Sequence, residues 1–449
     1  MFIQKLLIAN RGEIARRIAR TARRLGIVVV AVHSDADAEA PFVKEADERV
    51  RIGPSPPKES YLNAAAILAA AQQTGANAIH PGYGFLSEDA RFVQACTAAG
   101  IVFVGPPVSA MQAMASKIES KLTMAAAGVP VVPGPIEALD TEEAAVSAAS
   151  ALGYPVMLKA SAGGGGIGMA KCKSEKQLRA AYEDARKKGE MFFGSSRVFI
   201  EKLIDNPHHI EVQILADAHG NVRHLFDREC SIQRRNQKVL EETPSCLLDQ
   251  PTRAAMCAAA VKAAEAVGYV SAGTVEFVVD DARNYFFLEM NTRLQVEHPI
   301  TEETLGIDIV EQQLRIAAGE RLNLPADLSP RGHAIELRIC AEDPDKRFFP
   351  QPGTLGEVRW PSGAGIRVDA GVESGSVVPP HYDSLLAKLI GHGDTRAAAI
   401  ARLLRALEET RIEGIKTNLH MHQRILTDEG FVAGRTTTSF LEDRLGYKS

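Results

Sequence analysis

Apolar and polar residues alternate in the stretch LEMNTRLQVEHP at residues 288–299. Successive side chains of an extended chain point to opposite faces, so the alternation predicts a strand with one apolar and one polar face. The apolar face would carry Leu288, Met290, Leu294 and Val296. The polar face would carry Glu289, Asn291, Arg293, Gln295 and Glu297. Such a pattern is typical of a half-buried edge strand, but this polar set is able to bind a cation and an anion together.

A second strand is expected just upstream, at residues 274–279, where Glu276 is the single charge in an apolar run. An unpaired buried charge is costly, so Glu276 needs a partner. Residues 280–284 resemble a hairpin turn. With a four-residue loop at 281–284, Glu276 lies directly opposite Glu289, with Cβ atoms about 4.5–5.5 Å apart. A cation such as Mg²⁺ between them would remove their repulsion, whereas a five-residue loop would send the two carboxylates to opposite faces.

The first 115 residues alternate expected strands (5–9, 27–32, 78–80 and 101–104) with expected helices (13–25 and 62–73). This order predicts a doubly wound parallel sheet. The turn at residues 10–13 lacks the GxGxxG fingerprint, so a dinucleotide site is not supported. The loop HPGYGFLSE at 80–88 follows a strand's C-terminal end, where open α/β sheets bind ligands.

A glycine-rich segment, SAGGGGIGM at residues 161–169, follows an expected strand at 154–160 that contains Lys159. Glycines let backbone amides approach phosphate oxygens and let a lid swing. The segment is not a P-loop, because no GK[ST] follows. A flexible linker is the alternative, but such linkers seldom lie between two apolar β-runs. We therefore interpret the segment as a nucleotide lid.

Further strands are expected at 197–203, 208–215 and 331–339, and further helices at 117–127, 308–318 and 395–409. His209, Glu211 and Gln213 would share one face of the strand at 208–215. Residues 229–238, ECSIQRRNQK, are densely polar, which is typical of an exposed loop. Short β-runs after Pro352, followed by the last helix, indicate an α+β cap. The fold class is therefore α/β with α+β parts.

Length and composition narrow the class of protein. A chain of 449 residues with 45% hydrophobic residues is long enough for two or three domains. A net charge of −5 argues against a nucleic-acid or anionic-membrane partner. The six cysteines show no CxxC pair or zinc spacing, so reduced thiols are expected. No signal-peptide or membrane-spanning run is present in the sequence, and we expect a cytoplasmic protein.

LEMNTRLQVEHP, preceded by TVEFV, resembles the active-site hairpin of biotin carboxylases, members of the ATP-grasp superfamily. ANRGEIA at 9–15, HPGYGFLSE and GIKTN at 414–418 extend the resemblance over essentially the whole chain. In length the chain is similar to the stand-alone biotin carboxylase subunit of acetyl-CoA carboxylase. The resemblance implies an N-terminal domain at 1–115, an ATP-grasp domain at 116–330 with a lid at about 131–203, and a C-terminal domain at 331–449.

The resemblance also implies ATP- and bicarbonate-dependent carboxylation of biotin through carboxyphosphate. Mg²⁺, or Mn²⁺, would be held by Glu276, Glu289 and Asn291. The ATP contacts implied by the resemblance are Lys117, Lys159, Gly164, Gly165, Gly166, Glu201, Lys202, Leu203, His209, Gln233, Asn236, Glu276 and Glu289.

Bicarbonate would be bound by Lys238, Arg293, Gln295 and the backbone at Val296, because a guanidinium matches a planar oxyanion. Lys238 would also supply positive charge to the transferring phosphoryl group. Glu297 would take the proton of bicarbonate. An ordinary glutamate pKa of about 4.3 is low for a base; lid closure and nearby carboxylates would raise it and Arg293 would lower it, and the sequence leaves the balance open. Arg338 would stabilise the biotin enolate.

Three positions depart from the pattern of the family, which is commonly basic at Ile167, often His at Asn236 and usually Asn at Cys340. An ATP-grasp ligase with another acceptor is the alternative enzyme. A non-enzymatic ATP-binding module would lack a metal ligand or the base, and every one is present. No MKM-type biotinylation site occurs, so the carrier and the carboxyltransferase are expected on other chains. Acetyl-CoA is the default acceptor, another acyl-CoA or a 2-oxo acid stays open, and the family implies a homodimer.

Overall fold

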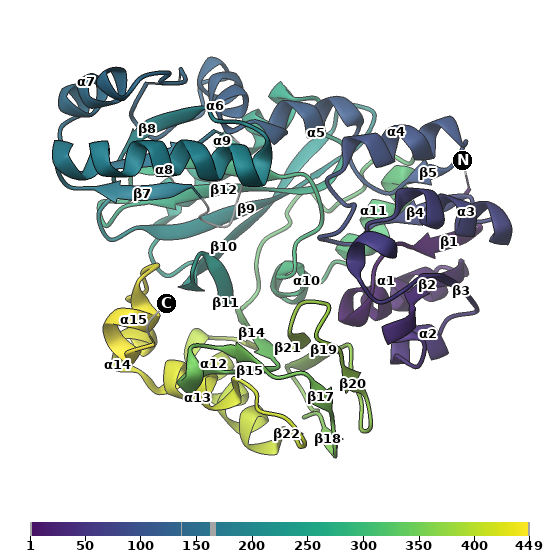
Figure 1. Cartoon of the computed structure of the whole chain (residues 1–449). Coiled ribbons are helices and arrows are strands. Elements are labelled where there is room, and N and C mark those ends of the chain that lie inside the picture. The colour runs from purple at the N-terminus through teal and green to yellow at the C-terminus, as the bar shows by residue number, and fades with distance from the viewer. Residues whose placement is uncertain (1, 136, 162–167, 448–449) are drawn as a thin grey trace.

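The computed structural model describes residues 2–135, 137–161 and 168–447. Within them the chain forms a five-stranded parallel sheet, a three-stranded sheet and an eight-stranded antiparallel sheet, with three two-stranded ribbons (Figure 1). This confirms the mixed α/β and α+β class. Among the described residues, none of the helices combines the length and apolar character needed to cross a membrane.

The five-stranded sheet forms the N-terminal region and has the order β3-β2-β1-β4-β5. Its strands are β1 (Lys5–Ile8), β2 (Val28–Ser34), β3 (Glu48–Gly53), β4 (Ala78–His80) and β5 (Val102–Phe103). Its helices are α1 (Gly12–Arg24), α2 (Pro41–Lys44), α3 (Ala64–Thr74), α4 (Ala90–Ala98) and α5 (Val108–Ala115). All four pairings are parallel. The predicted doubly wound sheet is confirmed.

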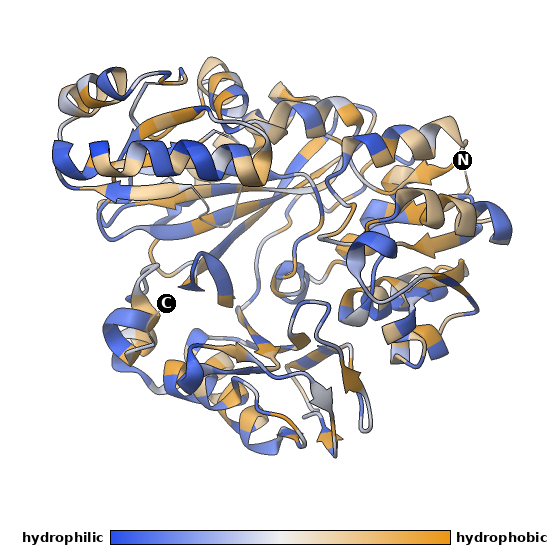
Figure 2. Ribbon diagram, viewed as in Figure 1, coloured by the Kyte–Doolittle hydropathy of each residue, from blue (hydrophilic) through white to orange (hydrophobic). Residues whose placement is uncertain are grey.

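The three-stranded sheet has the order β7-β6-β8 and lies under two helices. Its strands are β6 (Val156–Ala160), β7 (Met169–Cys172) and β8 (Val198–Lys202). Its helices are α7 (Glu142–Leu152) and α8 (Glu175–Phe193), and α6 (Lys117–Ala126) precedes them in the chain. Figure 2 shows apolar strands behind the largely hydrophilic α8. The predicted glycine-rich connection therefore joins two antiparallel strands, with Lys159 paired to Met169.

The eight-stranded sheet has the order β13-β12-β9-β10-β11-β14-β21-β19. The strands are β9 (His208–Ala216), β10 (Val222–Arg234), β11 (Gln237–Thr243), β12 (Ser271–Val279), β13 (Tyr285–Asn291), β14 (His333–Cys340), β19 (Ile366–Ala370) and β21 (Leu385–Gly393). Because β11 pairs with β14, the sheet continues from the central region into the C-terminal region without a break. The polar segment 229–238 is not the exposed loop that its composition suggests, since it forms the ends of β10 and β11.

Helices cover both ends of this sheet. The helices are α9 (Gln250–Ala266), α10 (His298–Leu305), α11 (Ile309–Ala317), α12 (Arg396–Glu409), α13 (Leu419–Thr427), α14 (Glu429–Val432) and α15 (Phe440–Leu445). Apolar side chains of α9 and of α12 to α15 pack on opposite ends of the sheet in two separate clusters. The short ribbon strands are β15 (Glu342–Asp343), β16 (Phe349–Pro350), β17 (Gly353–Thr354), β18 (Val358–Arg359), β20 (Val377–Val378) and β22 (Arg411–Ile412).

The hairpin of β12 and β13 places Glu276 directly opposite Glu289, as predicted, but with a different turn length and a shift in register. Val279 pairs with Tyr285, so the turn has five residues and the predicted four-residue loop is wrong. The register then shifts between the Phe277–Phe287 pair and the Glu276–Glu289 pair, which leaves Leu288 as an extra residue. A β-bulge of this kind returns later side chains to the other face. It cancels the effect of the longer turn.

The predicted strand through residue 297 is wrong beyond Asn291, where β13 ends. The Thr292 amide donates to the Glu88 carboxylate at 3.0 Å instead of to a neighbouring strand. Glu297 then serves as the N-cap position of α10, with Pro299 in the first turn, where proline is favoured. The polar groups of residues 293–297 therefore lie on a loop and do not share one strand face.

Candidate active site

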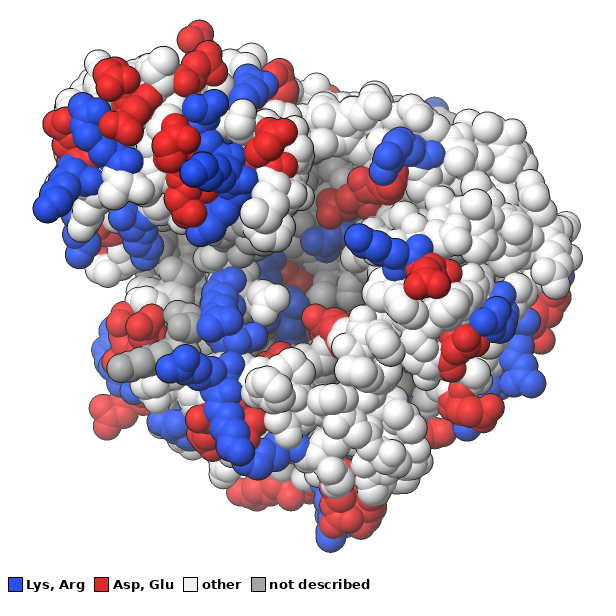
Figure 3. Space-filling model, in the orientation of Figure 1, with Lys and Arg blue, Asp and Glu red and all other residues white. Residues whose placement is uncertain are grey.

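A cavity of about 1110 Å³ lies between the three-stranded sheet, the eight-stranded sheet and the C-terminal strands. Figure 3 shows the molecule hollowed at this place, with charged side chains inside the hollow. Every described residue proposed above as a site residue lines it. They are Lys117, Lys159, Glu201, Lys202, Leu203, His209, Gln233, Asn236, Lys238, Glu276, Glu289, Asn291, Arg293, Gln295, Val296, Glu297 and Arg338. The cavity is thus built from residues far apart in the sequence.

The opposed carboxylates of Glu276 and Glu289 lie beside Asn291 at the end of the hairpin. Burial, followed by repulsion from Glu276, raises the pKa of Glu289. Lys117 Nζ lies 3.8 Å from the Glu289 carboxylate, and His209 Nε2 lies 3.1 Å from that of Glu276. Two carboxylates and an amide oxygen are hard donors, and their negative charge is only partly balanced, so this set fits Mg²⁺ or Mn²⁺.

Lys238 is the central cation of the cavity. Its ammonium pairs with Glu211, with Glu276 at 2.9 Å and with Glu297 at 2.6 Å. Burial would lower the pKa of Lys238, but these three carboxylates raise it well above its ordinary value. Lys238 is therefore charged, and its three carboxylates are also paired with Arg228, Arg338 and His209.

Glu297 bridges the two ends of the cavity. One carboxylate oxygen contacts Lys238 at 2.6 Å, and the other accepts from Arg338 Nη2 at 3.0 Å. Burial would raise the pKa of Glu297, but Lys238 and then Arg338 and Arg228 hold it below its ordinary value. The sequence alone did not give the direction in which the pKa of Glu297 is shifted; in the structure the three cations lower it. In this arrangement Glu297 is a stable anion.

Arg293 is held by residues that sequence reasoning did not connect to it. Its Nε donates to Glu88 at 3.0 Å and its Nη2 to Asn291 Oδ1 at 2.8 Å. Glu88 ends the loop HPGYGFLSE, for which the sequence indicated only a position after β4. The same carboxylate accepts from the Thr292 amide. This loop therefore orients the guanidinium and fixes the chain just after the metal-ligand candidates.

Arg228 was missed entirely. It is fully buried on β10, and its guanidinium donates to Glu211 at 2.6 Å and to Gln295 Oε1 at 2.6 Å. Gln295 Nε2 in turn donates to Glu276 at 2.8 Å. An arginine inside the buried run of β10 was the available signal, because such a charge must be paired. Arg228 thus holds Glu211, which contacts Lys238, and Gln295, which contacts Glu276.

Near Glu201, where nucleotide contacts are predicted, two lysines form ion pairs with one carboxylate. Glu201 pairs with Lys159, and with Lys121 at 3.1 Å. Burial would raise the pKa of Glu201, but Lys159 and Lys121 lower it. Glu201 was proposed as an adenine contact. Its carboxylate is paired with the two ammonium groups and so orients Lys159, and its contact with the nucleotide stays a prediction.

The other described residues predicted to contact the nucleotide also line the cavity. Lys202 Nζ donates to the Gly153 carbonyl at 2.8 Å, and the Leu203 amide donates to Pro155 at 3.3 Å. Gln233 Nε2 lies 3.0 Å from His209 Nδ1, which links β10 to β9. Gly164, Gly165, Gly166 and Ile167 lie outside the described residues.

Asn236 is a departure with a local physical reason. It follows Arg235 in the two-residue turn between β10 and β11, whose last pair is Arg234 with Gln237. Both turn residues have positive φ, 49° and 62°. Two-residue hairpins with two positive φ angles favour asparagine, whose short polar side chain tolerates this region. Asn236 therefore suits the turn and still reaches the cavity rim.

Arg338 and Cys340 lie on β14 at the far end of the cavity. Arg338 Nε donates to Glu241 at 2.6 Å, in addition to its contact with Glu297. Burial raises the pKa of the Cys340 thiol well above its ordinary value, so this departure adds a neutral side chain. The backbone amide of Cys340 donates to Asn418 Oδ1 at 2.8 Å, which ties this end of β14 to the start of α13.

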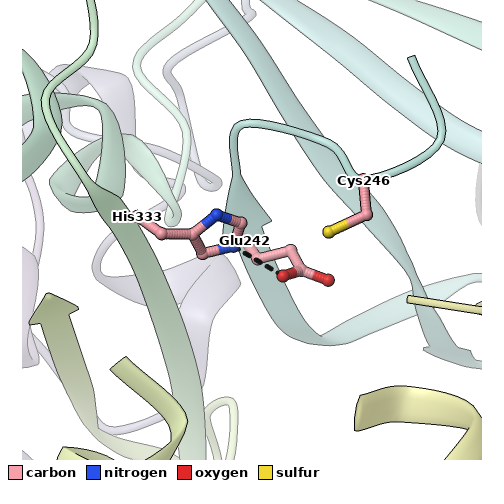
Figure 4. A group of neighbouring side chains, drawn as sticks. All are labelled: Glu242, Cys246 and His333. Carbon is pink, nitrogen blue, oxygen red and sulfur yellow. Dashed lines mark hydrogen bonds and ion pairs between the residues drawn. The ribbon is translucent and has the colours of Figure 1, made fainter. Parts of the chain in front are cut away.

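Another group of potential metal ligands, Glu242, Cys246 and His333, lies away from the cavity lining (Figure 4). Their ligand atoms lie within 4.8 Å of one another. The Glu242 carboxylate, however, accepts from His333 Nε2 at 2.7 Å and from Arg396 Nε at 2.6 Å. The guanidinium thus already supplies the positive charge that a metal would bring. We interpret this group as a structural ion pair between β11, β14 and α12.

Comparison with known proteins agrees with this geometry. Residues 2–111 match the family model for the biotin carboxylase N-terminal domain. Residues 116–324 match the ATP binding domain of carbamoyl-phosphate synthase L chain. Residues 336–443 match the biotin carboxylase C-terminal domain.

Individual relatives are similar over their full length. Biotin carboxylase 2 of Bacillus subtilis is 54% identical over 442 residues, which cover 98% of this chain and 99% of that protein. The biotin carboxylase of Haemophilus influenzae is 47% identical, with 99% of each chain covered.

Two solved structures are also similar. A biotin carboxylase–βγ-ATP complex from Campylobacter jejuni has a TM-score of 0.95 at 46% identity, with 98% of each chain covered. The biotin carboxylase domain dimer of the Hydrogenobacter thermophilus 2-oxoglutarate carboxylase, in complex with MgADP, ADP and bicarbonate, has a TM-score of 0.95 at 46% identity. It covers 100% of this chain and 99% of that one.

Proposed function

Because the chain belongs to the biotin carboxylase family and is an ATP-dependent ligase of the biotin carboxylation step, we propose that it catalyses the first half-reaction of an acetyl-CoA carboxylase. Similarity to separate biotin carboxylases over the full length of both chains supports this choice. A propionyl-CoA carboxylase alpha chain and one component of a pyruvate carboxylase are 48% and 49% identical to this chain. Another acyl-CoA or a 2-oxo acid is therefore the alternative acceptor.

The partners follow from this role. The biotin carboxyl carrier and the carboxyltransferase are separate chains, and the enzyme works in the cytoplasm. It forms a homodimer, for which the dimeric domain among the similar structures is the support. The domains are those expected above, 1–115, 116–330 and 331–449, and the family models begin and end near these boundaries.

Bicarbonate is a stable anion and a poor nucleophile, so ATP must activate it. Glu276, Glu289 and Asn291 hold Mg²⁺, or Mn²⁺ as the alternative ion. A divalent ion held by these residues would supply positive charge to the phosphates of ATP during phosphoryl transfer. Lys117 and Lys159, which line the cavity, contribute further positive charge toward the phosphates. Gly164, Gly165 and Gly166, outside the described residues, stay proposed ATP contacts.

Bicarbonate binds between Arg293, Gln295 and the backbone at Val296. Arg293 presents a planar fork to a planar anion, and its contacts with Glu88 and Asn291 hold the fork in place. Lys238 lies between this position and the carboxylates of the metal site, 2.9 Å from Glu276. Its ammonium is the cation best located to stabilise charge on the phosphoryl group during transfer.

Glu297 removes the proton of bicarbonate. Its low pKa depends on contacts with Lys238 and Arg338. Binding of substrate anions draws both cations toward the new negative charges, so the pKa of Glu297 rises when the base is needed. The bicarbonate oxygen attacks the γ-phosphorus of ATP and ADP leaves, which gives carboxyphosphate. Carboxyphosphate releases CO₂ and phosphate, phosphate takes the proton of the ureido nitrogen of biotin, and that nitrogen attacks CO₂ to give carboxybiotin. Arg338 stabilises the negative oxygen of the enolate.

The observation that supports this mechanism best is that Glu297 contacts two cations at once. They are Lys238, proposed to stabilise the phosphoryl group, and Arg338, proposed to stabilise the biotin enolate. The test is phosphate release from ATP and Mg²⁺, measured with and without bicarbonate and free biotin. We expect release that requires bicarbonate and increases with biotin. Release that requires an amine or carboxylate acceptor instead would contradict the proposal. Carboxylation rates with biotinylated carriers of different carboxylases would separate the possible acceptors.

A further inference from the structure

Two glutamates beneath Arg338 take no part in the mechanism above. Glu241 on β11 and Glu336 on β14 are directly opposed in the antiparallel ladder. Directly opposed residues have Cβ atoms about 4.5–5.5 Å apart. Both side chains are fully buried, with 0% exposure. Carboxylates on two such neighbouring side chains, away from water, repel if both are ionised, and the charge of Glu241 is among the causes that raise the pKa of Glu336.

The hydrogen bonds around the pair are unequal. Glu241 Oε1 accepts from Arg338 Nε at 2.6 Å. Among the described residues, Glu241 Oε2 and both carboxylate oxygens of Glu336 have no hydrogen-bond partner. Buried polar atoms are rarely left unpaired. A single proton between Glu336 and Glu241 Oε2 would give each acid a partner and would remove one negative charge.

Charge balance leads to the same result. Four buried acids face this part of the sheet, namely Glu13, Glu241, Glu297 and Glu336. The cations that face the pair are Arg338 beside Glu336 on β14, Lys388 on β21 and Lys238 on β11. Lys388 is engaged by Glu13 at 3.1 Å and by the Val296 carbonyl at 2.9 Å, while Lys238 is shared by three other carboxylates. His298, at the start of α10, is neutral, because burial and then Lys388 lower its pKa well below its ordinary value. Glu336 is left without a cation of its own.

We propose that Glu241 and Glu336 share one proton and act together as positioning residues for Arg338. The shared proton leaves the pair with one negative charge, on the Glu241 side, which holds the guanidinium through Nε. Arg338 Nη2 also lies 2.5 Å from Glu241 Oε1 and 3.0 Å from Glu297 Oε2, so Glu241 holds the same group that reaches toward Glu297 and the biotin oxygen. This assignment rests on the proposed role of Arg338 in the biotin step. Burial, the largest effect, raises the pKa of Glu336 well above its ordinary value and that of Glu241 to about 7, in agreement with a retained proton.

The proton itself is tested first, by infrared spectroscopy of the whole enzyme carrying ¹³C-labelled glutamate. At pH 7 we expect a C=O band of a protonated carboxyl that is lost in Glu336→Gln and that disappears from the wild-type enzyme at alkaline pH. Absence of such a band from the wild-type enzyme at pH 7 would overturn the proposal. This readout needs no substrate, so it stands even if Arg338 has another role or if the variants fold poorly.

Kinetics test the positioning. The amide of Glu336→Gln has the shape of the protonated acid and donates to Glu241 in the same way, so biotin-dependent kcat/KM at pH 7 should change by less than about threefold. As the pH is raised above 7, biotin-dependent kcat/KM should fall less in Glu336→Gln than in the wild-type enzyme. Glu241→Gln removes the charged partner of Arg338, and biotin-dependent kcat/KM should fall about tenfold or more. Bicarbonate-dependent ATP cleavage without biotin should fall less. Equal losses in both reactions, or equal effects of the two variants, would contradict positioning by the shared proton.

Discussion

At the scale of single residues, the environment of Glu297 determines how basic its carboxylate is. Its carboxylate is 1% exposed and is paired with two cations that come from different strands, Lys238 and Arg338. This pairing makes it a weak base until other anions compete for the same cations. The proposed role of Glu297 as the base therefore requires that substrate anions draw Lys238 and Arg338 away from its carboxylate.

Replacement of Glu297 by Gln tests this point. The amide keeps the shape of the side chain but cannot take a proton, so bicarbonate-dependent ATP cleavage should fall by about 10²–10⁴-fold. ATP binding, measured by calorimetry, should remain nearly intact. Glu408→Gln on the exposed face of α12 is the matched control and should leave both unchanged. Turnover close to that of the wild-type enzyme would remove Glu297 as the base.

The residues of the cavity could be found from the sequence more completely than their partners. Alternation along LEMNTRLQVEHP drew attention to Glu289, Asn291 and Glu297, but a pattern reports which residues share a face and not what they contact. Arg228 and Glu88 were missed as partners because their contacts lie 67 and 205 residues away in the chain. The direction of the Glu297 pKa depended on the same distant contacts, so it required coordinates.

At the scale of elements, the β12–β13 hairpin and the loop after β4 form one functional unit. The loop brings Glu88 to Thr292 and Arg293, at the point where β13 stops. The N-terminal region thereby positions Arg293, the proposed bicarbonate ligand, at the edge of the eight-stranded sheet. The loop is a positioning element, which explains why a turn-rich connection carries a carboxylate at its end.

Glu88→Gln should therefore weaken bicarbonate binding more than it slows the chemical step. The Glu88 side chain is 44% exposed, so solvent screens its pair with Arg293 and the expected rise in KM for bicarbonate is modest, about threefold to tenfold. Steady-state kinetics with varied bicarbonate measure this change. Glu39→Gln, with its side chain 88% exposed, is the charge-matched control. An unchanged KM with a lower kcat would contradict the positioning role.

The same hairpin shows what sequence reasoning at this scale can reach. The opposition of Glu276 and Glu289 was predicted correctly, although the turn was predicted one residue too short. The ladder between β12 and β9 is continuous from Ser271 to Val279, so the extra residue had to be accommodated on β13, at Leu288. A bulge is set by such pairing with a third strand. Neither the turn residues nor the alternation contains that information.

At the scale of the whole molecule, buried ion pairs join the N-terminal and C-terminal regions behind the catalytic loop. Lys388 on β21 is fully buried, contacts Glu13 of α1 at 3.1 Å and donates to the Val296 carbonyl at 2.9 Å. Glu302 of α10, in the central region, pairs with Arg17 of α1 at 2.7 Å and with Arg367 of β19 at 2.9 Å, and so links both ends of the chain. The position of Val296, a proposed bicarbonate contact, is thus tied to the packing of the N-terminal and C-terminal regions.

Lys388→Met tests this link. The variant leaves the Glu13 carboxylate buried without its cation, and breaking a buried pair from one side costs about 3–5 kcal/mol. Calorimetry should therefore record a lower Tm, and KM for bicarbonate should rise because the Val296 carbonyl has lost its donor. The double variant Glu13→Gln/Lys388→Met removes both charges and should recover part of the Tm but not the KM.

Recovery of Tm without recovery of KM would separate an effect on stability from an effect on the position of Val296. Lys188→Met removes an exposed ammonium whose pair with Asp184 is open to solvent, so it should change stability by less than about 0.5 kcal/mol and leave the KM unchanged. A double variant no more stable than Lys388→Met alone would mean that Glu13 and Lys388 are not coupled. Recovery of both Tm and KM would mean that the Val296 carbonyl does not need the ammonium, and that the two regions affect bicarbonate only through overall stability.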